Sequence, residues 1–188
     1  MSASEGSVKE NIEIRFFLTP ANTKKLLATW KSEKRRLQPY SFVDYYFVKG
    51  RSRAKIRTWR SAHVPKIEII FFRRRKGVKT EKGKAATGPR AASKELESLG
   101  FMPHLKIIKK RAWLVSKGGL PTYALELVPR LGWTGEIEVP LRDRKKIPRH
   151  LEQLRRMGAI GYTMKSMLQL MEERLEGKKM IEIFQPFL

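Results

Sequence analysis

The chain contains no cysteine, and it has few acidic residues beside its many basic ones. The absence of cysteine excludes disulfides, thiolate metal sites and a cysteine nucleophile, and it fits a cytosolic protein. The histidines His63, His104 and His150 are scattered singly, without the spacing of a metal site. No apolar run approaches the ~20 residues of a membrane span, and the polar residues 1–10 lack the hydrophobic stretch of a signal peptide. We therefore expect a soluble, cytoplasmic protein without membrane contact.

Positive charge dominates the composition. The 188 residues include 41 Lys and Arg against 18 Asp and Glu, so the formal charge is 41 − 18 = +23. With 41% hydrophobic residues the chain can nevertheless bury a core, which excludes a basic disordered tail. A folded domain with this field attracts polyanions, and nucleic acid, nucleotides and polyphosphate all fit the charge.

Two segments far apart in the chain, residues 11–15 and 136–139, alternate polar with aliphatic side chains. Successive side chains of a strand point to opposite faces, so the polar residues of each segment share one face while the aliphatic residues pack the other. Such a face needs either water or a ligand. The polar residues are Asn11, Glu13, Arg15, Glu136 and Glu138.

Two further segments, residues 55–57 and 109–111, place a pair of cations on one face of a β-prone run. Unpaired charges cost several kcal/mol each when they are buried, so such groups must pair, stay hydrated or await a ligand. A triphosphate with a divalent cation supplies both missing partners, because the metal binds glutamates and the phosphate oxygens bind Lys and Arg. Together the acidic and basic strands suggest a site for a metal and a polyanion.

The remaining pattern predicts an α+β fold. Residues 19–37 begin with Thr-Pro, typical of a helix N-terminus, and residues 89–99 form a short helix closed by Gly100. The basic segment 73–90 indicates an exposed hairpin or a flexible crossing. About eight strands, mostly joined by short turns, could close into an antiparallel β-barrel with a polar lumen and flanking surface helices. Strands are expected in 11–15, 42–48, 54–59, 66–72, 105–115, 122–128 and 135–139, and helices are expected from Pro148 and at 162–175.

The order of these motifs resembles the CYTH family, which comprises class IV adenylyl cyclases and thiamine triphosphatases among the triphosphate tunnel metalloenzymes. The resemblance covers residues 11–175 and implies an eight-stranded tunnel that binds triphosphate through cations and Mg²⁺ or Mn²⁺ through glutamates. We therefore expect a flexible segment 1–10, a tunnel domain 11–176 and an extension 177–188 of unknown role. The motifs are residues 11–15, Asp44-x-Tyr46-Phe47, residues 55–57, Leu99-Gly100-Phe101, residues 109–111, Glu126, Leu131-Gly132-Trp133 and residues 136–138.

Carried over one position at a time, the resemblance implies a role for individual residues. The implied metal ligands are Glu13, Glu136 and Glu138, and the implied catalytic residues are Glu13, Glu126 and Arg57. The implied triphosphate ligands are Arg15, Lys55, Arg57, Arg73, Lys109 and Arg111. Asn11 stands where the family has its first glutamate, and an amide carries no charge, so one metal position should be weakened.

Three functions fit these residues. The first is metal-dependent hydrolysis of an inorganic, thiamine or nucleoside triphosphate, by a monomer or homodimer, in which cations and metal stabilise charge on the phosphate oxygens. The second is a class IV adenylyl cyclase that makes cyclic AMP from ATP on the same scaffold. The third is a basic protein on a degenerate tunnel fold, which binds RNA or another polyanion through its exterior.

Overall fold

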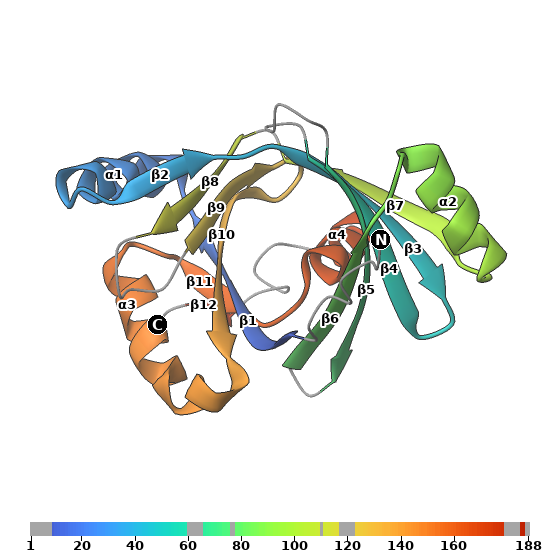
Figure 1. Ribbon diagram of the computed structural model, residues 1–188. Helices are drawn as coiled ribbons and strands as arrows, with labels where there is room; N and C mark the ends of the chain where they lie inside the picture. Colours follow the sequence, from blue (N-terminus) through green and yellow to red (C-terminus); the bar gives the residue numbers. More distant parts are fainter. Residues whose placement is uncertain are drawn as a thin grey trace. The chain divides into compact units, whose positions relative to one another are not determined.

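The computed structural model describes residues 9–59, 66–75, 78–109, 111–116, 123–178 and 185–186. These residues group into two compact units, which are taken in turn (Figure 1). The first unit consists of residues 1–10 and Ser41–Ile108, and the second consists of Asn11–Tyr40 and Lys109–Leu188.

The first unit is an antiparallel sheet of order β6-β5-β4-β3-β7. Alternate side chains of β3, β4 and β5 point to one face and form an apolar core with helix α2, while the other face carries charged residues. The elements are β3 (Phe42–Lys49), β4 (Ser52–Trp59), β5 (Ile67–Arg75), β6 (Val78–Ala85), α2 (Pro89–Ser98) and β7 (Met102–Ile108). The core residues are Phe47, Ala54, Ile56, Ile69, Ala92, Leu96 and Phe101.

Helix α2 has the termini that the sequence predicts. Pro89 occupies the first turn, where its missing N–H is not needed, and Gly100 follows the helix with φ +80°, a conformation that favours glycine. The basic segment predicted as a hairpin or a crossing belongs to the β5–β6 hairpin, in which Arg73 faces Thr80 across the ladder.

The second unit is built on an antiparallel sheet of order β2-β8-β9-β10-β1, with the short strand β11 paired to β1 and β12 paired to β11. Four helical segments accompany it. The elements are β1 (Lys9–Leu18), α1 (Pro20–Ser32), β2 (Arg36–Pro39), β8 (Arg111–Ser116), β9 (Tyr123–Val128), β10 (Gly132–Pro140), η1 (Leu141–Lys146), α3 (Ile147–Arg156), β11 (Gly161–Thr163), α4 (Met167–Leu175) and β12 (Gln185–Pro186).

The apolar face of the second sheet forms the core of its unit. Trp30 of α1 stacks on Tyr123 of β9 with 5.7 Å between ring centroids, and Phe16 of β1 meets the same tyrosine edge-on. Phe16 also lies over Gly135 on the neighbouring strand, where an added Cβ would come within 1.9 Å of the phenyl ring. Glycine at this position is therefore a packing requirement.

The prediction of a closed eight-stranded barrel is wrong in two respects, although the antiparallel sheet with flanking helices is confirmed. There are more than eight strands, and among the described residues β2 pairs only with β8 and β7 only with β3, so the ladders do not close. The run 105–115, expected as one strand, is interrupted between β7 and β8. At this break lies Lys109, and Tyr40 lies in the corresponding break between β2 and β3; both side chains are buried.

Two helix boundaries also differ from the prediction. The first helix ends at Ser32 rather than near Leu37, because Lys34 adopts φ +54° and the chain then enters β2. The last helix begins at Met167, where Ser166 and Gln169 form a capping box, and not at 162. No helix within the described ranges is both long and apolar enough to cross a membrane.

Candidate functional site

The ladder between β1 and β10 brings the predicted metal ligands together. Glu13 pairs with Glu138 and Arg15 pairs with Glu136, so the polar faces of the two strands coincide. Glu13, Glu136 and Glu138 each offer a carboxylate oxygen within 4.8 Å of the others. Glu13, which lies more than 120 positions before the other two glutamates, thus forms one acidic cluster with them.

This cluster fits a divalent cation of the Mg²⁺ or Mn²⁺ type. Such hard ions prefer oxygen ligands at about 2.1 Å in octahedral geometry, which places ligand oxygens roughly 3 to 4 Å apart. Glu13 is buried, Glu136 is partly buried and Glu138 is exposed, so the cluster runs from the interior of the unit to solvent. An ion with some of its waters could reach Glu138 first and Glu13 last.

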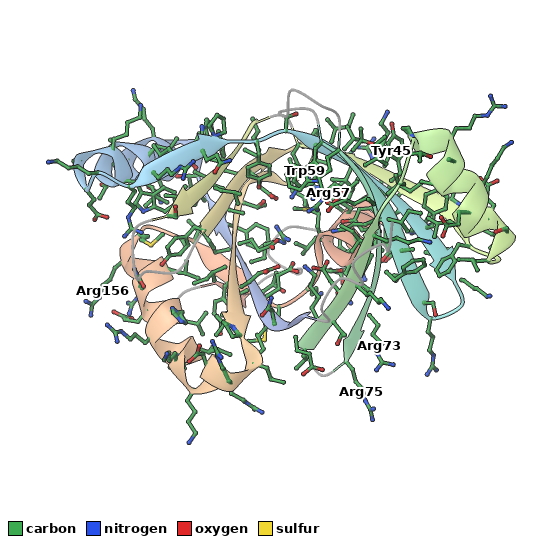
Figure 2. The ribbon with its side chains drawn as sticks, viewed as in Figure 1. Tyr45, Arg57, Trp59, Arg73, Arg75 and Arg156 are labelled. Carbon is green, nitrogen blue, oxygen red and sulfur yellow. The ribbon has the colours of Figure 1, made fainter. Side chains whose placement is uncertain are left out.

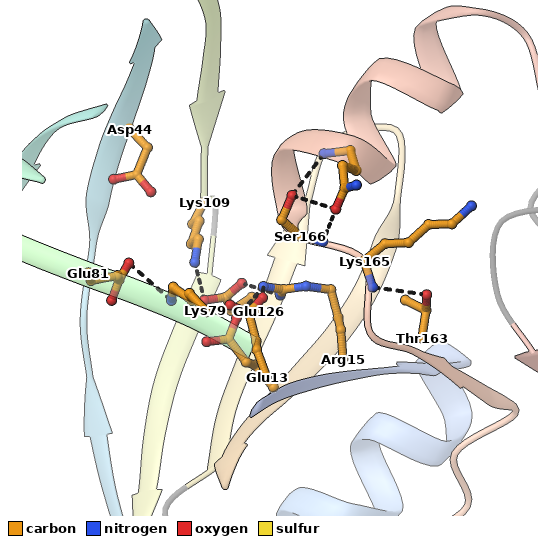
Figure 3. A network of polar contacts seen from close by, with 12 residues as sticks. Glu13, Arg15, Asp44, Lys79, Glu81, Lys109, Glu126, Thr163, Lys165 and Ser166 are labelled. Atoms are coloured by element: carbon orange, nitrogen blue, oxygen red, sulfur yellow. Dashed lines mark hydrogen bonds and ion pairs between the residues drawn. The ribbon is translucent and has the colours of Figure 1, made fainter. Parts of the chain in front are cut away.

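Arg15 lies among the carboxylates and is 2% exposed. Its Nη2 donates a hydrogen bond to Oε1 of Glu13 at 2.8 Å and another to Oε2 of Glu136 (Figure 3). Burial lowers the pKa of the Arg15 guanidinium, but the charges of Glu136, Glu13 and Glu126 outweigh desolvation and hold that pKa above its ordinary value. Arg15 is therefore a permanent cation that shares two carboxylates with the candidate metal.

Glu126 is the centre of a second set of contacts in the same unit (Figure 3). Its Oε1 accepts hydrogen bonds from Lys109 and from the hydroxyl of Tyr40, and its Oε2 lies 3.5 Å from Nη1 of Arg15. Burial alone would raise the pKa of Glu126, yet the charges of Lys109 and Arg15 together with these hydrogen bonds lower it. The Tyr40 pKa is raised, first by burial and then by the Glu126 charge.

Several buried polar atoms of this network have no hydrogen-bond partner among the described residues. Besides Nε and Nη1 of Arg15 and Oε2 of Glu126, they include Oγ1 of Thr134, which lies opposite Glu126 in the β9–β10 ladder. Donors and acceptors occur together in this set, and buried polar groups are normally satisfied by protein or ordered water. The unsatisfied atoms are typical of a site that completes its contacts with water or ligand.

Asn11 contacts the cluster through its side-chain amide. Its Nδ2 donates to Oε2 of Glu138 at 3.2 Å. The amide therefore orients a carboxylate without adding charge, whereas a glutamate at this position would repel Glu138. The weakened metal position stays a prediction, and the structure shows that Asn11 contacts Glu138, a member of the cluster.

The charged face of the first unit holds the other predicted cations. Nε and Nη2 of Arg57 both donate to the buried carboxylate of Asp44, each at 2.7 Å, in the forked geometry that guanidinium groups adopt with carboxylates. The guanidinium also lies over the ring of Phe42, 3.8 Å from its centroid. Arg57 is therefore held in one orientation by Asp44 and an aromatic ring.

Lys55 lies beside this pair and is 6% exposed. Its Nζ is 3.6 Å from Oδ2 of Asp44 and 3.9 Å from Oε1 of Glu81, which also contacts Lys79 at 3.1 Å. Burial and then the charge of Arg57 lower the pKa of Lys55, although Asp44 and Glu81 act in the opposite direction. The protein partners of Lys55 therefore neutralise only part of its charge, which is expected of a lysine that binds phosphate.

One predicted phosphate ligand, Arg73, does not join these clusters. Arg73 lies on the face of β5 that also carries Ile69 and Phe71, opposite to the face that pairs with Lys55, and it points outward at the end of the hairpin (Figure 2). Alternation excludes it from the charged face. The backbone of Arg111 begins β8, but its side chain lies outside the described part of the structure.

Tyr40, Asp44 and Lys79 belong to the two networks but were absent from the predicted sites. Asp44 opens the motif Asp44-x-Tyr46-Phe47, so a signal for it existed in the sequence. No such signal existed for Tyr40, because the break between β2 and β3, in which Tyr40 lies, was not predicted from the sequence.

Comparisons with known proteins give structural matches only. No protein-family model matches the sequence, and no curated protein matches it. A protein from Pyrococcus horikoshii OT3 has a TM-score of 0.70 at 20% identity, over 87% of this chain and 99% of its own. A candidate adenylyl cyclase from Hippeastrum, described as having a dominant triphosphatase activity, has a TM-score of 0.61 at 15% identity, over 92% and 98% of the two chains.

A candidate adenylate cyclase from Vibrio parahaemolyticus matches as well, with a TM-score of 0.60 at 11% identity over 87% of this chain and 98% of its own. Identities this low establish a shared fold only, so the chemistry has to be inferred from the residues of the site. The chain therefore has a CYTH-like fold, and the resemblance read from the order of its motifs is confirmed at the level of fold.

Proposed function

We propose that this protein is a metal-dependent enzyme that hydrolyses a triphosphate. The observation that carries the proposal is the cluster of Glu13, Glu136 and Glu138, whose oxygens lie within 4.8 Å of one another. Arg15 contributes one positive charge beside these carboxylates, and a divalent cation bound by the three glutamates would contribute two more. The fold, shared with candidate adenylate cyclases, supports the same class of chemistry.

In this proposal the three glutamates hold Mg²⁺ or Mn²⁺, and Lys109 binds phosphate oxygens of the substrate. A bound divalent ion neutralises charge on a transferring phosphoryl group and orients its oxygens. Glu13, the most buried of the three, is the carboxylate best placed to orient a water molecule away from bulk solvent. Arg15 holds Glu13 and Glu136 together by hydrogen bonds.

The contacts of Glu126 favour a positioning role over a role as general base. A base should have a pKa near the working pH, whereas the charges around Glu126 lower its pKa. Its hydrogen bond to Lys109 instead fixes the direction of the ammonium group. Tyr40 supports the same oxygen and keeps its proton, because burial and Glu126 raise its pKa.

In the first unit, Lys55 and Arg57 are the proposed triphosphate ligands. Asp44 fixes the fork of Arg57 by two hydrogen bonds, so the guanidinium is held in one orientation. Lys55 contributes a charge that its neighbours only partly neutralise. Preorganised cations of this kind stabilise the charge that spreads over phosphate oxygens in the transition state.

The second candidate function is that of an adenylyl cyclase. The fold that this chain shares with the candidate adenylate cyclase from Vibrio parahaemolyticus supports it. One experiment separates the two functions: the protein is incubated with tripolyphosphate, thiamine triphosphate or ATP in Mg²⁺ or Mn²⁺, and the products are resolved. Orthophosphate that disappears with EDTA supports the triphosphatase. Pyrophosphate with cyclic AMP supports the cyclase, and no turnover of any substrate with either metal refutes both.

A further inference from the structure

A basic surface lies on the second unit, apart from the acidic cluster and not used by the proposed function. It is formed by η1 and α3, whose residues 141–156 include seven Lys or Arg and two acidic residues, so the local charge is 7 − 2 = +5. All seven cationic side chains are exposed. We call this surface the η1–α3 surface.

Some of its cations have partners on the same surface. Lys146 lies 2.7 Å from Asp143, and Arg156 lies 3.0 Å from Glu152, which Arg155 also approaches at 3.9 Å. Arg155 and Arg156 are further explained by their place in the last turn of α3, where cations stabilise a helix. In Figure 2, Arg156 extends away from the unit.

Four other cations, Arg142, Arg144, Lys145 and Arg149, have no carboxylate within ion-pair distance among the described residues. Arg144 and Lys145 lie in the last turn of η1, where cations are favourable, so the helix explains these two. Arg149 lies in the first turn of α3, which contains no acidic residue, although a helix N-terminus favours negative charge. The position of Arg149 is therefore unfavourable in the folded chain alone, and a bound anion would offset this cost.

The neighbouring His150 is consistent with a positive local potential. Its pKa is lowered first by burial and then by the charges of Arg149 and Lys146, which the single carboxylate of Asp143 only partly offsets. His150 is therefore neutral at pH 7, and it adds no positive charge to the surface.

The chemistry of the surface selects the kind of anion. A membrane-binding helix inserts an exposed apolar face, but α3 buries Leu154, and none of the large hydrophobic side chains exposed in the described residues lies within 141–156. Arginine predominates among the unpaired cations, and its planar fork matches phosphate oxygens. We propose that the η1–α3 surface binds the phosphate backbone of nucleic acid without sequence preference.

The test uses the full chain and an RNA probe without a terminal triphosphate, so that the proposed active site cannot bind the end of the probe. A fluorescein-labelled RNA with a 5′-hydroxyl is titrated by anisotropy in EDTA, with a length of about 20 nucleotides so that it exceeds the ~4–16 that a small binding domain covers. The variant is Arg142→Gln/Arg144→Gln/Arg149→Gln. Its matched control, Lys24→Gln/Lys25→Gln/Arg36→Gln, removes three other exposed cations, so both variants have a formal charge of 23 − 3 = +20.

We expect the η1–α3 variant to bind RNA at least about tenfold more weakly at low salt and the control to change less than about threefold. If each removed arginine contacts one phosphate, the slope of log affinity against log salt falls by roughly 0.7 per residue, or about 2 in total. Equal losses in both variants, wild-type affinity in the first, or binding of phosphatidylserine vesicles in place of RNA would overturn the proposal. Triphosphate turnover is scored separately, because neither variant alters a residue of the acidic cluster.

Discussion

Nη2 of Arg15 and Oε1 of Glu13 lie 2.8 Å apart on one face of the same strand, and both side chains are almost entirely buried. Strand alternation places them together, but burial of the pair depends on Glu136 and Glu126 from two other strands. Three carboxylates thus surround one guanidinium. The arrangement makes the charge balance of this face sensitive to a single substitution.

Replacing Arg15 by alanine should lower the free energy of unfolding by about 3–5 kcal/mol, because it leaves buried carboxylates without their cation. Saturating Mg²⁺ should then raise the melting temperature more in the variant than in the wild type, since the ion can take over part of the neutralisation. Thermal unfolding with and without Mg²⁺ measures both effects. Identical Mg²⁺-induced shifts of the melting temperature in the two proteins would contradict the sharing of carboxylates between Arg15 and the metal. The shift of Arg15→Lys should lie between those of the wild type and Arg15→Ala.

Glu138→Gln should lower triphosphate turnover by at least about 100-fold, as the loss of one key electrostatic group does in other enzymes. Stability should change little, because Glu138 is exposed and the new amide keeps an oxygen that can accept from Asn11. Phosphate release and thermal unfolding report the two quantities. Glu176→Gln, on an exposed turn, is the control and should keep full activity; an active but strongly destabilised Glu138→Gln protein would refute the assignment.

Lys55→Met should keep the protein folded, because methionine has a similar volume and removes a buried charge that its neighbours only partly neutralise. Loss of a charge-assisted contact to phosphate costs about 1.5–3 kcal/mol, so kcat/KM for the triphosphate should fall roughly 10- to 100-fold. Steady-state kinetics test this. Lys66→Met removes an exposed lysine of the same unit and should leave kcat/KM unchanged.

Glu126 predicts a pH dependence of stability. Its folded pKa is lowered, so its contribution is fully present above the unfolded value of about 4.3 and is lost as the pH falls through the folded value. Between pH 7 and pH 3 the wild type should therefore lose more unfolding free energy than Glu126→Gln, measured by urea titration. If the single variant folds poorly, Glu126→Gln/Lys109→Met removes both charges, and it should show the same shallower acid loss.

Gly135→Ala should destabilise the protein by about 1–3 kcal/mol or more, because the new methyl group would meet the ring of Phe16 at 1.9 Å. Gly83→Ala, also within a strand, is the control, since its nearest contact would be an ordinary 3.8 Å. Chemical denaturation measures both variants. Phe16→Leu should recover part of the loss at Gly135, and equal effects of the two alanines would argue against the close approach.

The sequence by itself determined the chemistry of each strand. Alternation with a period of two assigns Glu136 and Glu138 to one face without any knowledge of their partners. Alternation alone does not exclude Arg73 from the face of Lys55, because that exclusion requires the register of β5, which comes from the structure. The termini of α2 were predictable from Pro89 and Gly100, because the signals that begin and end a helix are local.

Only the tertiary structure decided which strands meet and in which register. The approach of Glu13 to Glu138 depends on the β1–β10 ladder, and a slip of one residue would have turned the glutamates away from each other. The breaks that direct Tyr40 and Lys109 onto Glu126 left no local signal, since neither residue differs in its neighbourhood from an ordinary strand residue. The sequence determines residue types and their alternation locally, whereas contacts between distant strands arise from packing of the whole unit.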